Sequence, residues 1–176
     1  IEIISMGHRN PQGLTIDKDT NLIYSSEHGP KGGDEINTID TTKTIQNYGW
    51  PISSYGEHYG NEKKDNSELY KIAPLFKSHK DYGFIEPTKN YTPSIGISEL
   101  ILFDMLNQKI LLASSLGNNV SEGDMSLHIY FFDKDNLEKY KSITLNERIR
   151  DMLYLEKKNL IILFLESTSS IGVIKL

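Results

Sequence analysis

The sequence of 176 residues contains no cysteine, which excludes disulfide frameworks, thiolate catalysis and zinc sites with cysteine ligands. It also lacks an excess of positive charge, because 19 basic residues stand against 24 acidic ones and the net charge is −5. Nucleic-acid-binding surfaces need clustered positive charge, so no nucleic-acid partner is expected. No apolar run is long enough to span a membrane, so no membrane span is expected either.

Two further signals are missing. The five histidines show no spacing typical of metal ligands. No signal peptide is visible, and the chain begins at Ile1 instead of Met. We therefore expect the chain to be part of a longer protein, and the missing signal peptide says little about its location.

Helical periodicity is nearly absent, and short apolar runs alternate with turns rich in Asn, Asp, Gly and Lys. This pattern predicts an all-β fold. Three segments share a strand, a polar turn, a more apolar strand and a loop of small residues, and they are residues 14–26, 100–115 and 152–165. Repeated hairpins with buried inner strands are typical of propeller blades, so the sequence predicts about three blades.

The second blade is expected to gain outer strands at residues 127–133 and 137–145. Residues 61–90 break the rhythm of hairpins with a polar, charged stretch and are predicted to be a loop or insertion between blades. We predict a single partial β-propeller domain over residues 1–176.

Residues that carry chemistry are concentrated in loops of the first third of the chain. Arg9 offers a planar fork of donors that suits a carboxylate or a conjugated carbonyl. Glu27, Asp34 and Glu35 supply hard oxygen ligands, and the Gly29-Pro30 turn could point backbone carbonyls toward the same cation, as calcium prefers. A glycine-rich turn with solvated charges explains the pattern equally well, since no general calcium motif fits.

A pair of arginines stands near the third hairpin. Arg148 and Arg150 are two residues apart on a predicted strand, so their side chains point to the same face. Taken alone, such a pair is more often a solvated surface than a binding site, because arginine is usually exposed.

Three motifs resemble one family. They are Arg9-Asn10-Pro11-Gln12-Gly13-Leu14, residues 26–37 (Ser-Glu-His-Gly-Pro-Lys-Gly-Gly-Asp-Glu-Ile-Asn) and Asn47-Tyr48-Gly49-Trp50-Pro51. In this order they resemble the soluble glucose and aldose sugar dehydrogenases that depend on pyrroloquinoline quinone (PQQ), the glucose/sorbosone dehydrogenase family. Weaker matches to the family follow at Tyr91-Thr92-Pro93-Ser94-Ile95 and at Arg148-Ile149-Arg150-Asp151.

The resemblance implies a six-bladed β-propeller with PQQ and calcium on its top face. This chain would be about three blades of the C-terminal part, and its partner would be the N-terminal half of the same propeller. The implied activity is calcium-assisted oxidation of an aldose sugar, by hydride transfer from C1 to the quinone, with an external electron acceptor. A periplasmic or secreted location is implied as well.

Catalytic and cofactor-binding roles also follow from the resemblance. Arg9 would bind the reactive carbonyl of the quinone and polarise it, while Asn10 and Gln12 would orient the loop and the substrate. Tyr91 and Ser94 would flank the plane of the cofactor.

Two calcium sites are implied in the same way. The backbone carbonyls of Gly29 and Pro30 would hold the calcium that lies on PQQ. Glu35, with backbone oxygens around Tyr48 and Ser54, would form a second, structural site.

Arg148 and Arg150 would pair with the carboxylates of the cofactor, a geometry that suits arginine. The sequence departs from the family elsewhere. None of the five histidines occupies the motif of the catalytic base, which would lie upstream. Ser115-Leu116-Gly117-Asn118 stands where the family often has Ser-Leu-Lys-Gly, and Gly96-Ile97-Ser98 replaces Ala-Pro-Ser. The alternative is a non-catalytic, calcium-stabilised propeller that binds a glycan or a protein partner.

Overall fold

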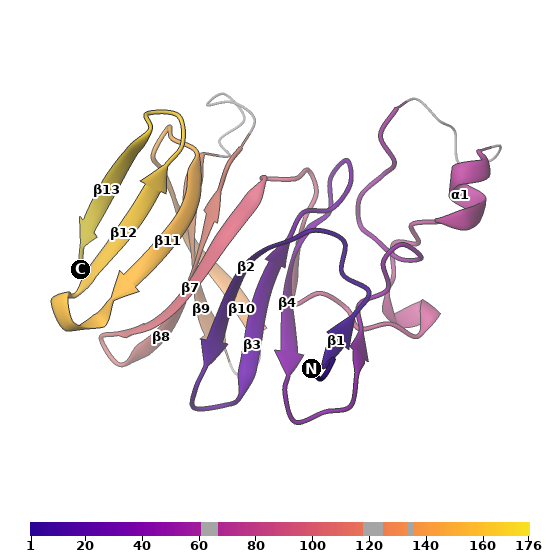
Figure 1. The fold of residues 1–176 in the computed structure, drawn as a ribbon, viewed down its shortest axis with the longest axis horizontal. Helices are drawn as coiled ribbons and strands as arrows, with labels where there is room; N and C mark the ends of the chain where they lie inside the picture. The colour runs from indigo at the N-terminus through magenta and orange to yellow at the C-terminus, as the bar shows by residue number, and fades with distance from the viewer. Residues whose placement is uncertain (61–66, 118–124, 134–135) are drawn as a thin grey trace.

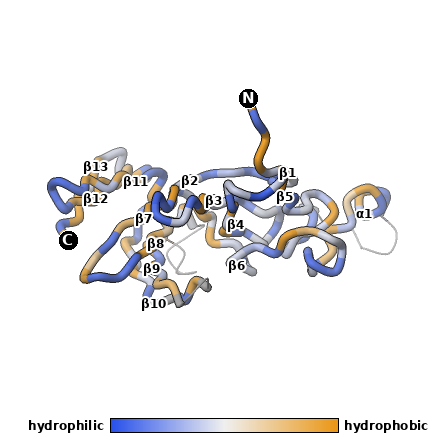
Figure 2. The backbone as a smooth tube through the Cα atoms, turned by 90° about the horizontal axis from the view of Figure 1, so that it is seen from below, coloured by the Kyte–Doolittle hydropathy of each residue, from blue (hydrophilic) through white to orange (hydrophobic). Residues whose placement is uncertain are grey.

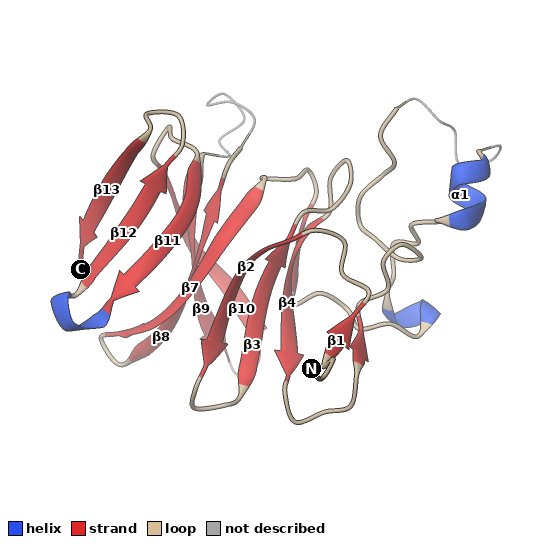
Figure 3. Ribbon diagram, in the orientation of Figure 1, coloured by secondary structure: helices blue, strands red, loops and turns tan. Residues whose placement is uncertain are grey.

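Three antiparallel sheets lie side by side in the computed structural model, which describes residues 1–60, 67–117, 125–133 and 136–176 (Figure 1). Helices are few and short in this part of the chain, as Figure 3 shows. The all-β prediction is therefore confirmed.

The strands follow one another around the sheets in chain order, apart from one small parallel pair. The first sheet has the order β2 (Pro11–Asp17), β3 (Leu22–Glu27), β4 (Asp34–Asp40) and β6 (Lys89–Tyr91). The second sheet contains β7 (Ile97–Met105), β8 (Gln108–Ser115), β9 (Ser126–Asp133) and β10 (Asn136–Thr144). The third sheet contains β11 (Ile149–Leu155), β12 (Leu160–Leu165) and β13 (Ser170–Lys175). Outside the sheets, β1 (Ser5–Met6) pairs in parallel with β5 (Gln46–Asn47).

The three predicted hairpins are present as β2–β3, β7–β8 and β11–β12. Their turns share a feature that the sequence repeat did not make explicit. Asn21, Asn107 and Asn159 stand at equivalent places just before the second strand, with φ of 60°, 62° and 52°. Asparagine tolerates this left-handed conformation better than most residues, so the repeat is set by turn chemistry as well as by apolar strands.

Residues 61–90 differ from the loop that the sequence predicts. Residues 61–66 lie outside the described part of the chain. The remainder includes the short helix α1 (Glu68–Ile72), the 3-10 turn η1 (Lys80–Tyr82) and the start of β6, which completes the first sheet. Because β6 pairs with β4, the excursion returns to the sheet that it leaves.

The second sheet is buried on both faces, which explains its long apolar runs. Leu100 and Leu111 pack in one cluster with residues of the first sheet. Ile101 and Ile110 pack in a second cluster with residues of the third sheet. Neighbouring residues of a strand point to opposite faces, so a strand between two cores must be apolar at successive positions.

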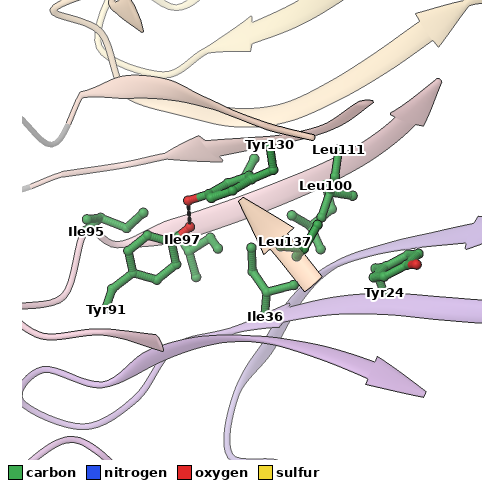
Figure 4. Packing of buried hydrophobic residues seen from close by; sticks show 10 residues of the cluster. Tyr24, Ile36, Tyr91, Ile95, Ile97, Leu100, Leu111, Tyr130 and Leu137 are labelled. Carbon is green, nitrogen blue, oxygen red and sulfur yellow. Dashed lines mark hydrogen bonds between the residues drawn. The ribbon is translucent and has the colours of Figure 1, made fainter. Parts of the chain in front are cut away.

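A buried pair of tyrosines joins the first two sheets. The hydroxyl groups of Tyr91 on β6 and Tyr130 on β9 form a hydrogen bond inside the first cluster (Figure 4). Tyr130 is fully buried, and burial raises the pKa of its hydroxyl to about 12.

We expect Tyr130→Phe to destabilise the protein by about 1–3 kcal/mol, because it leaves the buried hydroxyl of Tyr91 without its partner. The urea unfolding midpoint of the full-length protein measures this effect. Tyr154→Phe is the matched control, since that hydroxyl bonds Asn159 at the surface. Equal midpoints for the two variants would contradict the prediction.

The first strands of the three sheets lie next to one another. β7 contacts both β2 and β11, and Figure 2 shows this arrangement from below. On the third sheet, Phe164, Ile171 and Val173 remain exposed. Such a surface suits the expected N-terminal half of a propeller, which stays a prediction. Among the described residues, no helix combines the length and apolar character needed to cross a membrane.

Candidate active site

A cavity of about 860 Å³ is lined by loops that join the strands at one end of the sheets. These loops lie toward the top of Figure 1. Six separate parts of the chain line it. They contribute Arg9 and Asn10; His28, Gly29, Pro30, Lys31, Gly32 and Asp34; Tyr59; Pro93, Ser94 and Gly96; Leu116 and Gly117; and Arg148. Residues of four sequence motifs that are far apart in the chain therefore meet in one cavity.

The side chain of Arg9 makes three contacts and its backbone N–H a fourth before any ligand binds. Its Nη1 donates to the carbonyl oxygens of His28 at 3.0 Å and Gly29 at 2.7 Å. The guanidinium carbon lies 5.2 Å from the centre of the Trp50 ring, within the range of a cation–π contact. The backbone N–H of Arg9 donates to Glu27 Oε2 at 2.6 Å. The direction of the guanidinium is thus set by the loop that follows β3.

Asn10 and Gln12 are connected to each other, but only Asn10 lines the cavity. Gln12 Nε2 donates to Asn10 Oδ1 at 3.1 Å and to the backbone carbonyl of Pro11 at 3.2 Å. Gln12 therefore contributes by holding Asn10, and the geometry gives it no direct place at the cavity wall.

The turn at Gly29 requires glycine. A Cβ atom at this position would lie 2.1 Å from the carbonyl oxygen of Gly33, so any side chain would force the loop open. The close approach of the loop to itself places Gly29 and Pro30 at the cavity wall. The predicted carbonyl ligand of Gly29 already accepts a hydrogen bond from Arg9.

Glu35, Tyr48 and Ser54, the predicted second calcium site, come together around a small cavity of about 10 Å³, enough for about one water molecule. His79 lies among them. Its Nδ1 donates to the backbone oxygen of Tyr48 at 2.8 Å, and its Nε2 lies 3.5 Å from Glu35 Oε1. Within the described ranges, no cluster of three or more His, Asp or Glu side chains has the geometry of a metal site.

The charge of this small site depends strongly on pH. Burial raises the pKa of Glu35 to about 8, with a further contribution from the negative charge of Glu27. Burial lowers the pKa of His79. At neutral pH, Glu35 therefore holds a proton and His79 is uncharged. Because Nδ1 of His79 carries its proton toward Tyr48, Nε2 is left as a lone pair that has no hydrogen-bond partner among the described residues.

Tyr91 and Ser94 differ in their relation to the cavity. Ser94 lines it, although its hydroxyl donates to Asp34 Oδ1 at 2.7 Å. Tyr91 is buried in the core, where its hydroxyl bonds Tyr130 (Figure 4). It is not among the residues that line the cavity. The structure therefore departs from the expectation that Tyr91 flanks the cofactor, because the alternation of β6 turns its ring inward.

Arg148 and Arg150 point the same way, as their spacing predicts, and both pair with Glu166. Arg148 Nε donates to Glu166 Oε1 at 3.1 Å, and Arg150 Nε donates to Glu166 Oε2 at 2.8 Å. Arg148 lines the cavity and also donates to the carbonyl oxygen of Gly117 at 2.9 Å. Arg150 is more exposed and is not part of the cavity wall.

Sequence reasoning missed several contributors to this site. Trp50 and Tyr59 stand in the segment of the first third of the chain that is rich in motifs and aromatic residues, which is a signal for a binding site. Trp50 contacts Arg9, and Tyr59 lines the cavity. His79 and Glu166 had no such signal, because they stand in segments without a motif and meet their partners only in the folded chain.

Comparison with known proteins identifies the family. The sequence profile described as glucose/sorbosone dehydrogenase matches residues 1–171. The chain belongs to the glucose/sorbosone dehydrogenase family. This confirms the resemblance that the motifs carry.

Individual members of the family match over different lengths. Aldose sugar dehydrogenase YliI of Escherichia coli (strain K12) is 47% identical over 62 residues, which are 35% of this chain and 16% of the relative. Quinoprotein glucose dehydrogenase B of Acinetobacter calcoaceticus is 44% identical over 59 residues, which are 33% of this chain and 12% of the relative. The chain spans a third or less of the length of the curated relatives that it matches.

A solved structure of this family covers the chain almost completely. The crystal structure of the soluble aldose sugar dehydrogenase of Escherichia coli in its apo-form matches with a TM-score of 0.77 at 25% identity. The match covers 99% of this chain and 47% of that chain. The three sheets described above thus correspond to slightly less than half of a sugar dehydrogenase.

Proposed function

We propose that this chain forms the cofactor-binding half of a PQQ-dependent aldose sugar dehydrogenase. The observation that carries the proposal is the cavity of about 860 Å³ that brings together Arg9, the Gly29-Pro30 turn, Ser94 and Arg148. Pockets for cofactors commonly have volumes of roughly 300–1,000 Å³. Membership of the sugar dehydrogenase family and the similarity to a quinoprotein glucose dehydrogenase support the same activity.

Two arginines that line the cavity, Arg9 and Arg148, suit a ligand with a polar carbonyl and carboxylates. Arg9 would bind and polarise the reactive carbonyl of PQQ, and Trp50 keeps its guanidinium in place. Arg148 would pair with a carboxylate of the cofactor. When bound, PQQ supplies the acceptor for the hydride that leaves C1 of the sugar. Arg150 would act through Glu166, since it lies outside the cavity wall.

The donor set at the cavity wall also fits calcium. The backbone carbonyls of Gly29 and Pro30 would hold the ion beside the cofactor, because calcium prefers oxygen ligands and accepts backbone carbonyls. Arg9 donates to Gly29 in the ligand-free geometry, so calcium and Arg9 would share that carbonyl or exchange it.

A second calcium ion fits the small site around Glu35. Glu35 is a buried carboxyl that has no Lys or Arg within ion-pair distance in the described structure, and Ser53 Oγ and His79 Nε2 lack hydrogen-bond partners there. Unpaired polar atoms around a small cavity are a sign of a missing water or ion. Calcium at this place would require Glu35 to release its proton.

The proton acceptor for the sugar hydroxyl is proposed to come from the N-terminal half of the propeller. Among the histidines, His28 lines the cavity, but its Nε2 is buried and has no partner among the described residues. Activity would therefore need the complete protein, with an external acceptor to reoxidise the cofactor and, by resemblance, a periplasmic or secreted location.

One observation favours the alternative of a non-catalytic propeller that binds a glycan or a protein. Glu166 pairs with both Arg148 and Arg150, so its single negative charge offsets one of their two positive charges and occupies donors of both side chains. The two functions differ in whether PQQ binds at all.

The test uses the full-length protein purified without cofactor. We expect that PQQ and calcium together restore the reduction of an electron-accepting dye by an aldose, and that neither restores it alone. Binding of PQQ is followed separately by quenching of tryptophan fluorescence. If PQQ neither binds nor supports turnover, while calcium still raises the melting temperature, the dehydrogenase proposal fails and the binding propeller is favoured.

A further inference from the structure

Asp34, the first residue of β4, has an unusual set of partners. Its side chain is 1% exposed, and it accepts four hydrogen bonds. Oδ1 accepts from the backbone N–H of Gly29 at 3.2 Å and from the hydroxyl of Ser94 at 2.7 Å. Oδ2 accepts from the backbone N–H groups of Ile95 at 3.1 Å and Ile97 at 3.0 Å. No Lys, Arg or His forms an ion pair with Asp34 among the contacts of the described residues.

These four donors lie in, or directly after, two different loops. Gly29 is in the loop between β3 and β4. Ser94 and Ile95 belong to the loop between the first and second sheets, and Ile97 is the first residue of β7, directly after that loop. Both loops supply wall residues of the large cavity, and Asp34 itself reaches that wall. Backbone hydrogen bonding between the two segments is short, and it includes the bond from the N–H of Gly33 to the carbonyl oxygen of Tyr91 at 2.8 Å. Asp34 therefore carries most of the polar contact between them.

We propose that Asp34 is the positioning residue that fixes the two loops of the cavity wall at the distance that PQQ requires. The inference rests on the proposed function. A carboxylate suits this role because its two oxygens offer about four acceptor positions, which matches the four hydrogen bonds that Asp34 accepts. Asparagine at position 34 would offer only one acceptor oxygen. Its NH₂ group would face either Gly29 and Ser94 or Ile95 and Ile97, which are donors themselves.

The bond from Ser94 also defines what Ser94 can do. Its hydroxyl proton is directed to Asp34, so toward a ligand the oxygen can only accept a hydrogen bond. Asp34 thereby sets both the place and the polarity of Ser94.

The first test follows amide hydrogen exchange in the cofactor-free, full-length protein. The amides of Gly29, Ile95 and Ile97 lie outside the regular strand ladder or at its end, yet we expect slow exchange because Asp34 accepts from each. In Asp34→Asn, exchange should rise at least about tenfold in peptides that cover residues 28–33 and 94–98, because both donor pairs cannot then be satisfied at once. Fast exchange of these amides in the unaltered protein would overturn the inference even if Asp34→Asn fails to fold.

The second test measures the dissociation constant of PQQ by fluorescence titration in excess calcium. We expect Asp34→Asn to weaken binding by about 10- to 100-fold, the range typical for residues that hold ligand-binding groups in place. Ile36→Val is the control, because it removes one methyl group from the core side of the same strand but leaves all four hydrogen bonds of Asp34 in place. We expect it to leave PQQ affinity within about twofold.

The two proposals can fail separately. If the unaltered protein does not bind PQQ, the proposed function fails, while the exchange experiment still decides whether Asp34 joins the loops. If the unaltered protein binds PQQ and Asp34→Asn binds it equally well, or if Ile36→Val weakens binding as much, the positioning role is overturned.

Discussion

Replacing Arg9 with alanine should lower kcat/KM of the PQQ-dependent reaction by about 10²–10³-fold, the range seen when one preorganised donor to a developing charge is removed. Arg9 is oriented by two backbone carbonyls and by the Trp50 ring before the ligand arrives, so little reorganisation is needed. Loss of the side chain also removes the donor to Gly29, which frees the loop. Steady-state kinetics of the full-length protein loaded with PQQ and calcium measure the effect.

Two further variants separate charge from geometry. Arg9→Lys keeps the positive charge but not the planar fork, so we expect an intermediate loss. Lys18→Ala removes a cation from an exposed turn remote from the cavity and should change kcat/KM by less than twofold. A loss in Arg9→Ala no greater than that in Lys18→Ala would contradict the role of Arg9.

Calcium affinity at the Glu35 site should rise by about 50-fold between pH 6 and pH 8 and level off above that. Calcium binds the ionised carboxylate, and burial raises the pKa of Glu35 to about 8. The ionised fraction therefore grows from roughly 1% to roughly 50% over this range. Isothermal titration of the full-length, PQQ-free protein at several pH values measures the affinity and the proton that is released.

The same pKa shift sets the stability of the calcium-free protein. Folding raises the pKa of Glu35 from its usual value of 4.5 to about 8. The protonated Glu35 side chain therefore makes its full contribution to the free energy of unfolding below about pH 4.5, and this contribution is lost as the pH rises to about 8. A shift of this size corresponds to roughly 5 kcal/mol. Glu35→Gln should keep the neutral shape, remove this pH dependence and abolish the calcium response. Glu156→Gln, at an exposed position, should behave like the unaltered protein, and a calcium response that persists in Glu35→Gln would refute the site.

The sequence predicts the scaffold well because its signals are local. The hairpins follow from apolar strands and from turns in which Asn21, Asn107 and Asn159 take the left-handed conformation. The binding motifs also predict which segments meet, since Arg9 and Arg148 line one cavity.

Other parts of the site depend on contacts that no local pattern encodes. Tyr91 lies in a motif, but its hydroxyl finds Tyr130 on another sheet, which removes the ring from the cavity. His79 stands in an irregular segment and enters the Glu35 site only through the fold of that segment. Whether Arg148 and Arg150 form a solvated surface pair or bind a ligand depends on Glu166, which is 18 residues from Arg148 along the chain.

The second sheet, buried on both faces, has a consequence for how the protein could be engineered. The cavity walls come from loops of all three sheets, so the width of the mouth depends on the spacing between sheets. That spacing is fixed by the volumes of side chains such as Leu111 and Ile110 in the two cores. A directed-evolution search for altered substrate breadth should therefore return core substitutions that change volume, far from any residue that touches the ligand.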